Sequence, residues 1–464
     1  MTEPTAPDTL KLTVENFGPI ARAEVDLRPL TVFVGPSNTG KSWLATLVYA
    51  LHRYFARAHP FFPMHPVFRF PERRDNAGAA ADALVSDAQP PRTVPPMLAT
   101  ELAGAVDAGA DALVAEVKRC YGVVAAEALV GRGRAKSARI GWESTPGHAR
   151  FELTLSRNGS ELCTRLADDH PLSLATGDLP VPPGADPGSQ RAGDAMAQVG
   201  ELALPGLVGV LHRPAFHLPA DRGGVMHTHV LLARAAIGRA AGGPEFNAPS
   251  ISGTVADYLS ELIEVDRVRR PGAIPNAAAD IEHDLLAGSI RIVRSDLIGY
   301  PRFLYQPNGW RQPLPFTSVS SMVAELAPLV LFLRHVVVPG DTLIVDEPEA
   351  HLHPAMQVEL TRQLAGVVNA GVRVIVTTHS EWLIEQLGNI VRRAALPESG
   401  REEAALGAGQ VGAWLFVQKK RPKGSVVKEI PLDEDGQYPC GFDDVAIALH
   451  NDWAAITSRI EGSP

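Results

Sequence analysis

Hydrophobic residues at the start of the chain follow the spacing of strands and then of a helix. Short strands are predicted at 11–14 and 23–27, on either side of a Phe-Gly-Pro turn, and the continuous apolar run at 30–34 predicts a buried strand. Apolar residues from 43 to 55 then recur at helical spacing. The sequence therefore predicts a strand that runs through a loop directly into a helix.

The last third of the chain alternates between strands and helices. Its predicted elements are a hairpin at 289–293 and 302–306, a helix at 323–335, a strand at 342–345, a helix at 354–369 and a strand at 373–377. Strands that alternate with helices favour parallel pairing through right-handed crossovers. Gly371 lies where a glycine that ends a helix is expected. The predicted fold class is α/β, with a mixed sheet and a parallel core.

The region between these parts has a different composition. Residues 56–206 are rich in alanine and proline, and we interpret them as an inserted α+β region. Within it, 98–130 predicts helix, 139–142 and 150–156 predict strands of a small sheet, and 177–195 predicts loop or disorder.

These patterns divide the chain into successive segments. After the inserted region, a strand at 216–219 returns to the core, and helices at 227–240 and 255–266 form a helical lobe. The predicted segments are the first part of the core at 1–55, the insertion at 56–206, a core strand segment at 207–224, the helical lobe at 225–288, the second part of the core at 289–425 and a C-terminal extension at 426–464.

Composition indicates a globular protein. Of 464 residues, 45% are hydrophobic and 20% are charged, which is enough apolar material for a large core. The sequence predicts neither a signal peptide nor a membrane span, so we expect a soluble, cytoplasmic protein with no membrane partner. The three cysteines lie far apart, which excludes a disulfide framework and a four-cysteine zinc site. The net charge of −9 argues against a globally basic nucleic-acid binder.

A glycine-rich loop joins the strand at 30–34 to the following helix. It fits the G-x-x-x-x-G-K-[ST] pattern with Gly35, Pro36, Ser37, Asn38, Thr39, Gly40, Lys41 and Ser42. The glycines let backbone amides turn toward phosphates, and the positive end of the helix supports the bound anion. Lys41 would neutralise the β and γ phosphates, and Ser42 would ligate Mg²⁺. The loop predicts binding of ATP with Mg²⁺; the alternative is a fortuitous glycine turn.

Polar residues follow two of the buried strands. Asp346 and Glu347 end the strand at 342–345, and they point to opposite sides because side chains alternate along a strand. Asp346 would hold Mg²⁺ through Ser42 or water, while Glu347 would orient or deprotonate the attacking water. His379 ends the next strand, whose end lies beside Glu347 if the crossover is right-handed, and it can reach the γ phosphate. Glu347 and His379 are the predicted catalytic residues.

Together these motifs resemble the ABC-type ATPase fold of the SMC, RecF and OLD-nuclease group. The residues that carry the resemblance are the strand at 12–20, the block Asp-Glu-Pro-Glu-Ala-His-Leu-His-Pro at 346–354, and His379 with Ser380. The resemblance implies a P-loop NTPase of ABC type that works as an ATPase. It also implies a homo-oligomer, a dimer or higher, whose ATP sites are shared between subunits.

By the same resemblance, residues 319–326 occupy the place of the signature motif, which caps the ATP of a partner subunit. Ser320 and Ser321 are the predicted contacts of this segment, although Ser321 and Met322 stand where glycines are usual. The alternative is an ordinary cap for the helix at 323–335.

Two pairs of histidines are not predicted to bind a metal ion. His351 and His353 fall in a loop that crosses the dimer interface in the related ATPases, and His227 and His229 have no third ligand nearby in sequence. Arg222 ends a segment that resembles an "xxPAxR" motif of the group. It either senses nucleotide, braces the subunit interface, or forms a surface pair with its neighbour.

Charged clusters leave the question of a nucleic-acid partner open. Basic residues gather at 132–139, 267–270 and 419–423 without interleaved aromatic residues, so nucleic-acid contact is one alternative and solvated loops are the other. The acidic run at 433–435 resembles the acidic pair of a TOPRIM nuclease, but an acidic turn is the stronger interpretation.

An ATPase without a second active site should act as a nucleotide-driven switch. The first hypothesis is the ATPase component of a multi-gene anti-phage defence system, similar to those of PARIS or Septu, that controls a partner effector such as a nuclease. The second is a RecF-like or SMC-like ATPase of DNA repair or chromosome maintenance that binds DNA directly. A transporter subunit is disfavoured by the long insertions and by the unusual signature segment.

Overall fold

The structure of the protein is a computed structural model. The residues it describes are 9–56, 93–131, 135–145, 149–157, 159–167, 172, 199–200, 203–229, 251–267, 270–294, 300–394, 396, 404–421, 423–431, 451 and 453. The predictions at 177–195, at 433–435 and in the helix beyond residue 229 lie outside these residues.

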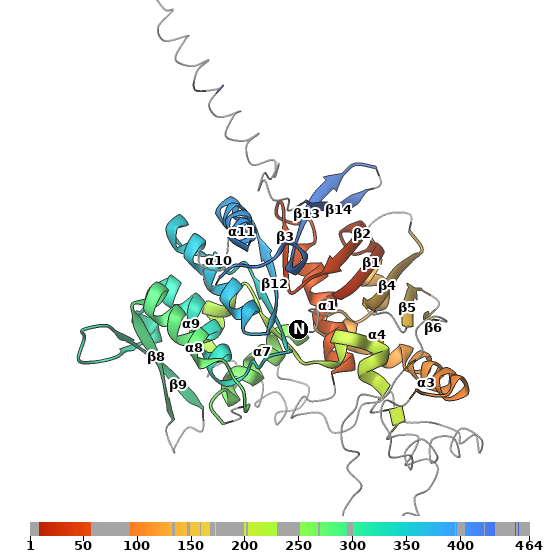
Figure 1. The fold of residues 1–464 in the computed structure, drawn as a ribbon, viewed down its shortest axis with the longest axis horizontal. Helices are drawn as coiled ribbons and strands as arrows, with labels where there is room; N and C mark the ends of the chain where they lie inside the picture. The colour runs from red at the N-terminus through yellow and green to blue at the C-terminus, as the bar shows by residue number, and fades with distance from the viewer. Residues whose placement is uncertain are drawn as a thin grey trace, which may run out of the picture.

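A mixed sheet of eleven strands runs through the molecule (Figure 1). Its order is β6-β5-β4-β1-β2-β14-β13-β3-β12-β11-β7. The parallel core consists of β13 (Val411–Lys419), β3 (Leu30–Val34), β12 (Arg373–Thr378), β11 (Thr342–Asp346) and β7 (Ala215–Leu218). Every residue of β3, β7 and β11 is buried, as expected for parallel strands covered on both faces.

The remaining strands form an antiparallel wing on the side of β1 (Thr9–Phe17). They are β2 (Ile20–Leu27), β4 (Ser137–Thr145), β5 (Ala149–Ser156), β6 (Gly159–Leu166) and β14 (Gly424–Ile430), of which β14 is parallel to β2. The prediction that residues 139–142 and 150–156 belong to a small sheet is wrong. β4 pairs with the free edge of β1, so β4, β5 and β6 extend the main sheet. Burial favours this arrangement, because Trp142 of β4 and Phe151 of β5 stack 5.1 Å apart in the main core.

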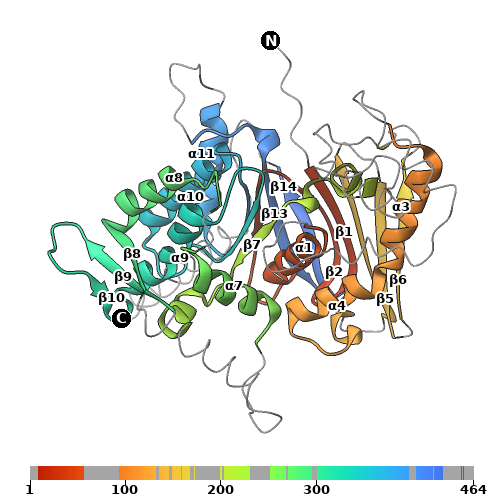
Figure 2. The same ribbon diagram turned by 90° about the horizontal axis from the view of Figure 1, so that it is seen from below.

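Helices cover both faces because alternate residues of the central strands enter two different cores. Phe33 packs on the side of α1 (Lys41–Phe55), α3 (Pro96–Ala108) and α4 (Ala110–Tyr121), which follow one another along one face (Figure 2). Val32 and Val34 pack on the other side, with α9 (Ser321–His335), α10 (Pro354–Asn369) and α11 (Glu381–Ala394). The layered α/β fold predicted from the sequence is confirmed.

A second, three-stranded sheet of β8 (Gly288–Arg294), β9 (Pro301–Pro307) and β10 (Leu314–Pro315) lies at the end of the molecule opposite to β5 and β6 (Figures 1 and 2). Beside it are α7 (Gly253–Glu264), α8 (Pro275–Ile281) and the π-helix η4 (Glu282–Leu286). Short 3-10 helices complete the fold at η2 (Ala126–Leu129), η3 (Gly209–His212), η5 (Phe316–Ser318) and η7 (Ala408–Gln410). Gly371 follows α10 with φ of 90°, as its predicted role at a helix end requires. The segment boundaries given by the sequence stay predictions.

Candidate nucleotide-binding site

The glycine-rich loop connects β3 to α1 in a conformation that glycine makes accessible. Gly35 has φ of 140° and Gly40 has φ of 100°. A Cβ atom at Gly35 would lie 2.7 Å from the carbonyl oxygen of Phe416, so only glycine fits there. α1 begins at this loop without a side-chain cap, which leaves its first amides available to an anion.

Lys41 is folded against the loop. Its Nζ donates hydrogen bonds to the carbonyl oxygens of Gly35 at 2.8 Å and Pro36 at 3.0 Å, and to Nε2 of His379 at 2.9 Å. Burial lowers the pKa of Lys41, and the nearby carboxylates of Glu347, Glu349 and Asp346 oppose this shift. The ammonium group is therefore held between the loop and His379, at the end of β12.

Asp346 lies buried at the end of β11, where its two carboxylate oxygens have different partners. Oδ1 accepts a hydrogen bond from the Thr377 hydroxyl at 2.8 Å, and Oδ2 lies 3.0 Å from Nε2 of His217. Burial alone would raise the pKa of Asp346, but His217, Thr377 and Ser42 together hold it below its usual value.

The hydroxyl of Ser42 and the ionised carboxylate of Asp346 form an oxygen donor set that fits Mg²⁺. Their role as ligands of a shared Mg²⁺ stays a prediction. Within the described part of the chain, no group of three or more histidine, cysteine, aspartate or glutamate side chains forms a metal site of its own.

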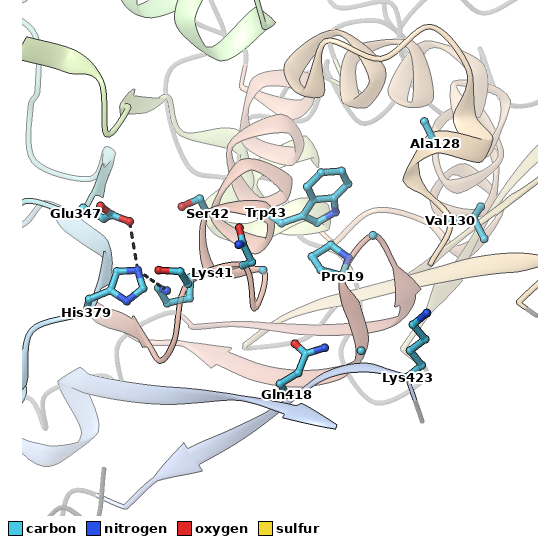
Figure 3. Close-up of a pocket in the computed structure, with 15 residues that line it drawn as sticks. Pro19, Lys41, Ser42, Trp43, Ala128, Val130, Glu347, His379, Gln418 and Lys423 are labelled. Atoms are coloured by element: carbon cyan, nitrogen blue, oxygen red, sulfur yellow. Dashed lines mark hydrogen bonds and ion pairs between the residues drawn. The ribbon is translucent and has the colours of Figure 1, made fainter. Parts of the chain in front are cut away.

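Glu347 and His379 face the same space from neighbouring strand ends (Figure 3). Oε1 of Glu347 lies 3.4 Å from Nε2 of His379, and their side chains are 39% and 34% exposed. Glu347 adopts φ of 44°, a left-handed conformation that is uncommon for a residue with a Cβ atom. Asp346 is buried, whereas Glu347 is partly exposed and lines the pocket.

Glu349 and His217 support the ends of these strands and were not singled out from the sequence. Glu349 accepts hydrogen bonds at Oε1 from the Thr378 hydroxyl at 2.6 Å and from the His379 amide at 2.7 Å, so it holds the strand end that carries His379. His217 contacts Asp346 from β7. A polar residue inside an otherwise apolar strand was the available signal for His217, and a third carboxylate two positions after Glu347 was the signal for Glu349.

The glycine-rich loop opens into a pocket of about 880 Å³. Glu347 and His379 lie at one end, and Trp43, Ala128 and Val130 lie toward the other (Figure 3). Ala128 and Val130 belong to the region interpreted as an insertion, so that region contributes directly to the site.

Trp43 forms an aromatic wall of this pocket. Its ring centroid is 4.5 Å from that of Tyr121 and 5.9 Å from that of Phe17. A Cβ atom at Gly18 would lie 2.3 Å from the indole, so the absence of a side chain at Gly18 leaves space for the Trp43 ring. A ring held in this way suits stacking on the base of a nucleotide.

Ser320 is the N-cap of α9. Its hydroxyl accepts a hydrogen bond from the Val323 amide at 3.4 Å, in agreement with the capping alternative. Ser320 and Ser321 are exposed and are not among the residues that line the pocket of their own chain. Their contact with ATP on a second subunit stays a prediction.

Arg222 is not the surface residue of one sequence-based alternative. Only 1% of it is exposed, because its guanidinium lies between α9 and the end of β11 and donates hydrogen bonds to backbone carbonyls of both. Neither histidine pair shows metal geometry. His229 is buried between the carbonyl oxygens of Met226 and Pro301, and His353 caps α10.

Comparison with known families gives a match over residues 256–385 to a family described as "AAA domain, putative AbiEii toxin, Type IV TA system". The matched segment resembles an AAA domain. It contains Ser320, Asp346, Glu347 and His379, and it begins after the phosphate loop. The α/β fold of P-loop NTPase type predicted from the sequence agrees with this match and with the sheet topology.

Solved structures of SMC head domains are similar at low identity. A SmcHead bound to the C-winged helix domain of ScpA has a TM-score of 0.42 and 11% identity, over 92% of this chain and 99% of that chain. The SMC head domain from Thermotoga maritima has a TM-score of 0.36 and 13% identity, over 92% and 99%. A Smc head domain with an extended coiled coil, bound to the C-terminal domain of ScpA from Pyrococcus furiosus, has a TM-score of 0.39 and 11% identity, over 92% and 98%. No curated protein matches the chain. None of its described helices is long and apolar enough to cross a membrane.

Proposed function

We propose that this protein binds ATP with Mg²⁺ in the pocket beside the phosphate loop and hydrolyses it. The observation that carries the proposal is the convergence of Lys41, Asp346, Glu347 and His379, which come from three separate parts of the chain. The ends of parallel strands at such an edge are the usual place for a phosphate ligand in this fold class.

Each residue has a distinct task in the proposed reaction. The loop amides and Lys41 bind the β and γ phosphates, and Ser42 and Asp346 hold Mg²⁺, which neutralises phosphate charge when bound. Glu347 orients the attacking water and accepts its proton as the new bond to the γ phosphorus forms and ADP leaves. His379 contacts the γ phosphate from the neighbouring strand end.

Substitution of Lys41 and Glu347 separates binding from turnover. Lys41→Ala should weaken ATP binding by about 10- to 100-fold, since it removes a charged hydrogen-bond donor to the phosphates. Glu347→Gln should leave the ATP affinity unchanged and lower kcat by about 10²- to 10⁴-fold, because a general base is lost. Equilibrium binding of labelled ATP and release of phosphate measure the two effects.

Lys428→Ala is a matched control, because Lys428 is exposed on β14 and does not line the pocket. It should behave as the unmodified protein in both assays. Full hydrolysis by the Glu347→Gln variant would overturn the assignment of Glu347, and ATP binding that Lys41→Ala leaves unchanged would overturn the site.

At a finer level, we infer that the ATPase is a switch in a homo-oligomer, in which Ser320 and Ser321 contact ATP on a second subunit. We favour its role as the ATPase of an anti-phage defence system that controls an effector nuclease. The description of the matching family as a toxin of a toxin–antitoxin system supports a role of this kind.

The alternative is a RecF-like or SMC-like ATPase that binds DNA itself. The two functions differ in what the isolated protein does with DNA. Tight, ATP-dependent binding with a steep dependence on salt would favour the alternative, because each phosphate contact releases counterions. Absence of such binding, with ATP hydrolysis intact, is the result expected for an ATPase that acts through a partner.

A further inference from the structure

Arg222 is a buried cation that no step of the proposed reaction uses. It follows β7, and its guanidinium reaches the end of β11. Nη1 donates a hydrogen bond to the carbonyl oxygen of Asp346 at 2.6 Å, and Nη2 donates one to the carbonyl oxygen of Glu347 at 3.2 Å. One side chain thus holds two successive carbonyl groups at the point where the strand ends in the carboxylates of the site.

The backbone held by Arg222 is the strained part of the site. Glu347 has φ of 44°, which residues with a Cβ atom avoid unless the surroundings fix it. On the other side of Glu347, its amide donates to the carbonyl oxygen of Thr377 at 2.9 Å. Since the carbonyl is held by Arg222 and the amide by β12, the direction of the Glu347 side chain depends on both contacts.

The same guanidinium is attached to α9. Nε donates a hydrogen bond to the carbonyl oxygen of Glu325 at 2.9 Å and lies 3.3 Å from Oε2 of the Glu325 carboxylate. A Cβ atom at Gly223 would lie 2.4 Å from Oε1 of Glu325, so the absence of a side chain at Gly223 leaves room for this carboxylate. Glu325 lies in the second turn of the helix that Ser320 caps.

We propose that Arg222 is a positioning residue that couples the N-terminal part of α9 to the backbone of Glu347. A displacement of α9 carries Glu325 with it, and the planar guanidinium transmits this displacement to the carbonyls of Asp346 and Glu347. The inference rests on the proposed function. It adds that the state of the helix after Ser320 controls how Glu347 is aimed, so that a contact made by α9 on a second subunit changes turnover in its own pocket.

Arg222→Lys tests the coupling, because lysine keeps the charge but lacks the rigid fork that holds two carbonyls and α9 together. We expect kcat to fall by about 10- to 100-fold, which is the loss produced when a catalytic group is displaced by about 1 Å. The affinity for ATP should stay within twofold, because Arg222 does not line the pocket. Glu325→Gln should give a smaller loss of kcat in the same direction, because it removes the charge and leaves the carbonyl contact.

Arg270→Lys is the matched control. Arg270 pairs with Asp341, which directly precedes β11, so it fixes the same strand at the end away from the pocket. This variant should retain the kcat of the unmodified protein.

A double substitution separates positioning from general structural damage. If Arg222 acts through Glu347, then Arg222→Lys should lower kcat no further once Glu347→Gln is present. Multiplied losses in the double variant, an unchanged kcat in Arg222→Lys, or a parallel loss of ATP affinity would overturn the inference. A protein that hydrolyses no ATP at all would overturn the proposed function, whereas active wild-type protein with an inactive Glu347→Gln variant upholds it independently of Arg222.

If Arg222→Lys fails to fold, as judged by thermal unfolding, the decision passes to Glu325→Gln and to its combination with Glu347→Gln. An unchanged kcat in Glu325→Gln would then overturn the inference. If Glu325→Gln lowers kcat on its own but lowers it no further once Glu347→Gln is present, the inference is supported.

Discussion

Only one of the two carboxylate oxygens of Glu349 accepts hydrogen bonds. Substitution of Glu349 by alanine and by glutamine should therefore reduce stability by different amounts. Oε1 accepts both hydrogen bonds, from the Thr378 hydroxyl and from the His379 amide, while Oε2 has no hydrogen-bond partner among the described residues. Glu349→Ala removes the acceptor and leaves two donors in a buried place. Glu349→Gln keeps one oxygen that can accept both bonds.

The energies follow from this count. Hydrogen bonds to a charged group contribute about 1.5–3 kcal/mol each and neutral ones about 0.5–1.5 kcal/mol. Glu349→Ala should therefore lower the free energy of unfolding by about 3–6 kcal/mol, and Glu349→Gln by about 2 kcal/mol. Because His379 loses its amide contact only in the alanine variant, the alanine variant should also lose most of its kcat.

Urea unfolding followed by circular dichroism gives the stabilities, and release of phosphate gives kcat. The unfolding comparison needs a single cooperative transition in all three proteins. Equal losses of stability in the two variants would refute the reasoning, because they would show that the charge of Glu349, and not its accepting oxygen, stabilises the strand end.

Two further predictions concern the aromatic wall and the dependence of stability on pH. Gly18→Ala should displace the Trp43 ring and raise the KM for ATP by about tenfold, the value of one aromatic contact, with little change in kcat. Gly159→Ala also places a side chain at positive φ but meets no atom within 4 Å, so it should leave KM unchanged. Burial lowers the pKa of His52 to about 4. The unfolded chain therefore binds this proton first as the pH falls below about 6.5, and His52 should cost about 2 kcal/mol of stability between pH 7.5 and 5. Urea unfolding at the two pH values should show that His52→Asn lacks this loss; an equal loss in the variant would contradict the assignment.

Local patterns were sufficient for the elements and motifs that lie close together in sequence. The alternation after residue 289 predicted α9, β11, α10 and β12 to within a few residues, and the glycine loop was found from its own spacing. These features depend on the periodicity of burial, which the order of apolar and polar residues within each segment determines.

Pairings between distant segments were not accessible in this way. β4 joins β1 although more than a hundred residues separate them, and an alternating strand looks the same whether it extends a large sheet or forms a small one. The burial of Arg222 depends on carbonyl groups of Glu325 and Asp346, which carry no side-chain signal at all. His217 was not recognised as the partner of Asp346 because β7 and β11 lie far apart in the sequence and their pairing was not predicted.

The segment around Val130 is attached to the start of the sheet. The Gly18 amide donates to the carbonyl oxygen of Leu129 at 2.8 Å, and the Gly131 amide donates to that of Asn16 at 2.6 Å. Ala128 and Val130 line the pocket beside the glycine-rich loop, and α4 is the helix before η2 in the chain. If the pocket binds nucleotide as proposed, a molecule that binds α4 and shifts this segment changes the affinity for nucleotide. By thermodynamic linkage, nucleotide then changes the affinity for that molecule by the same factor.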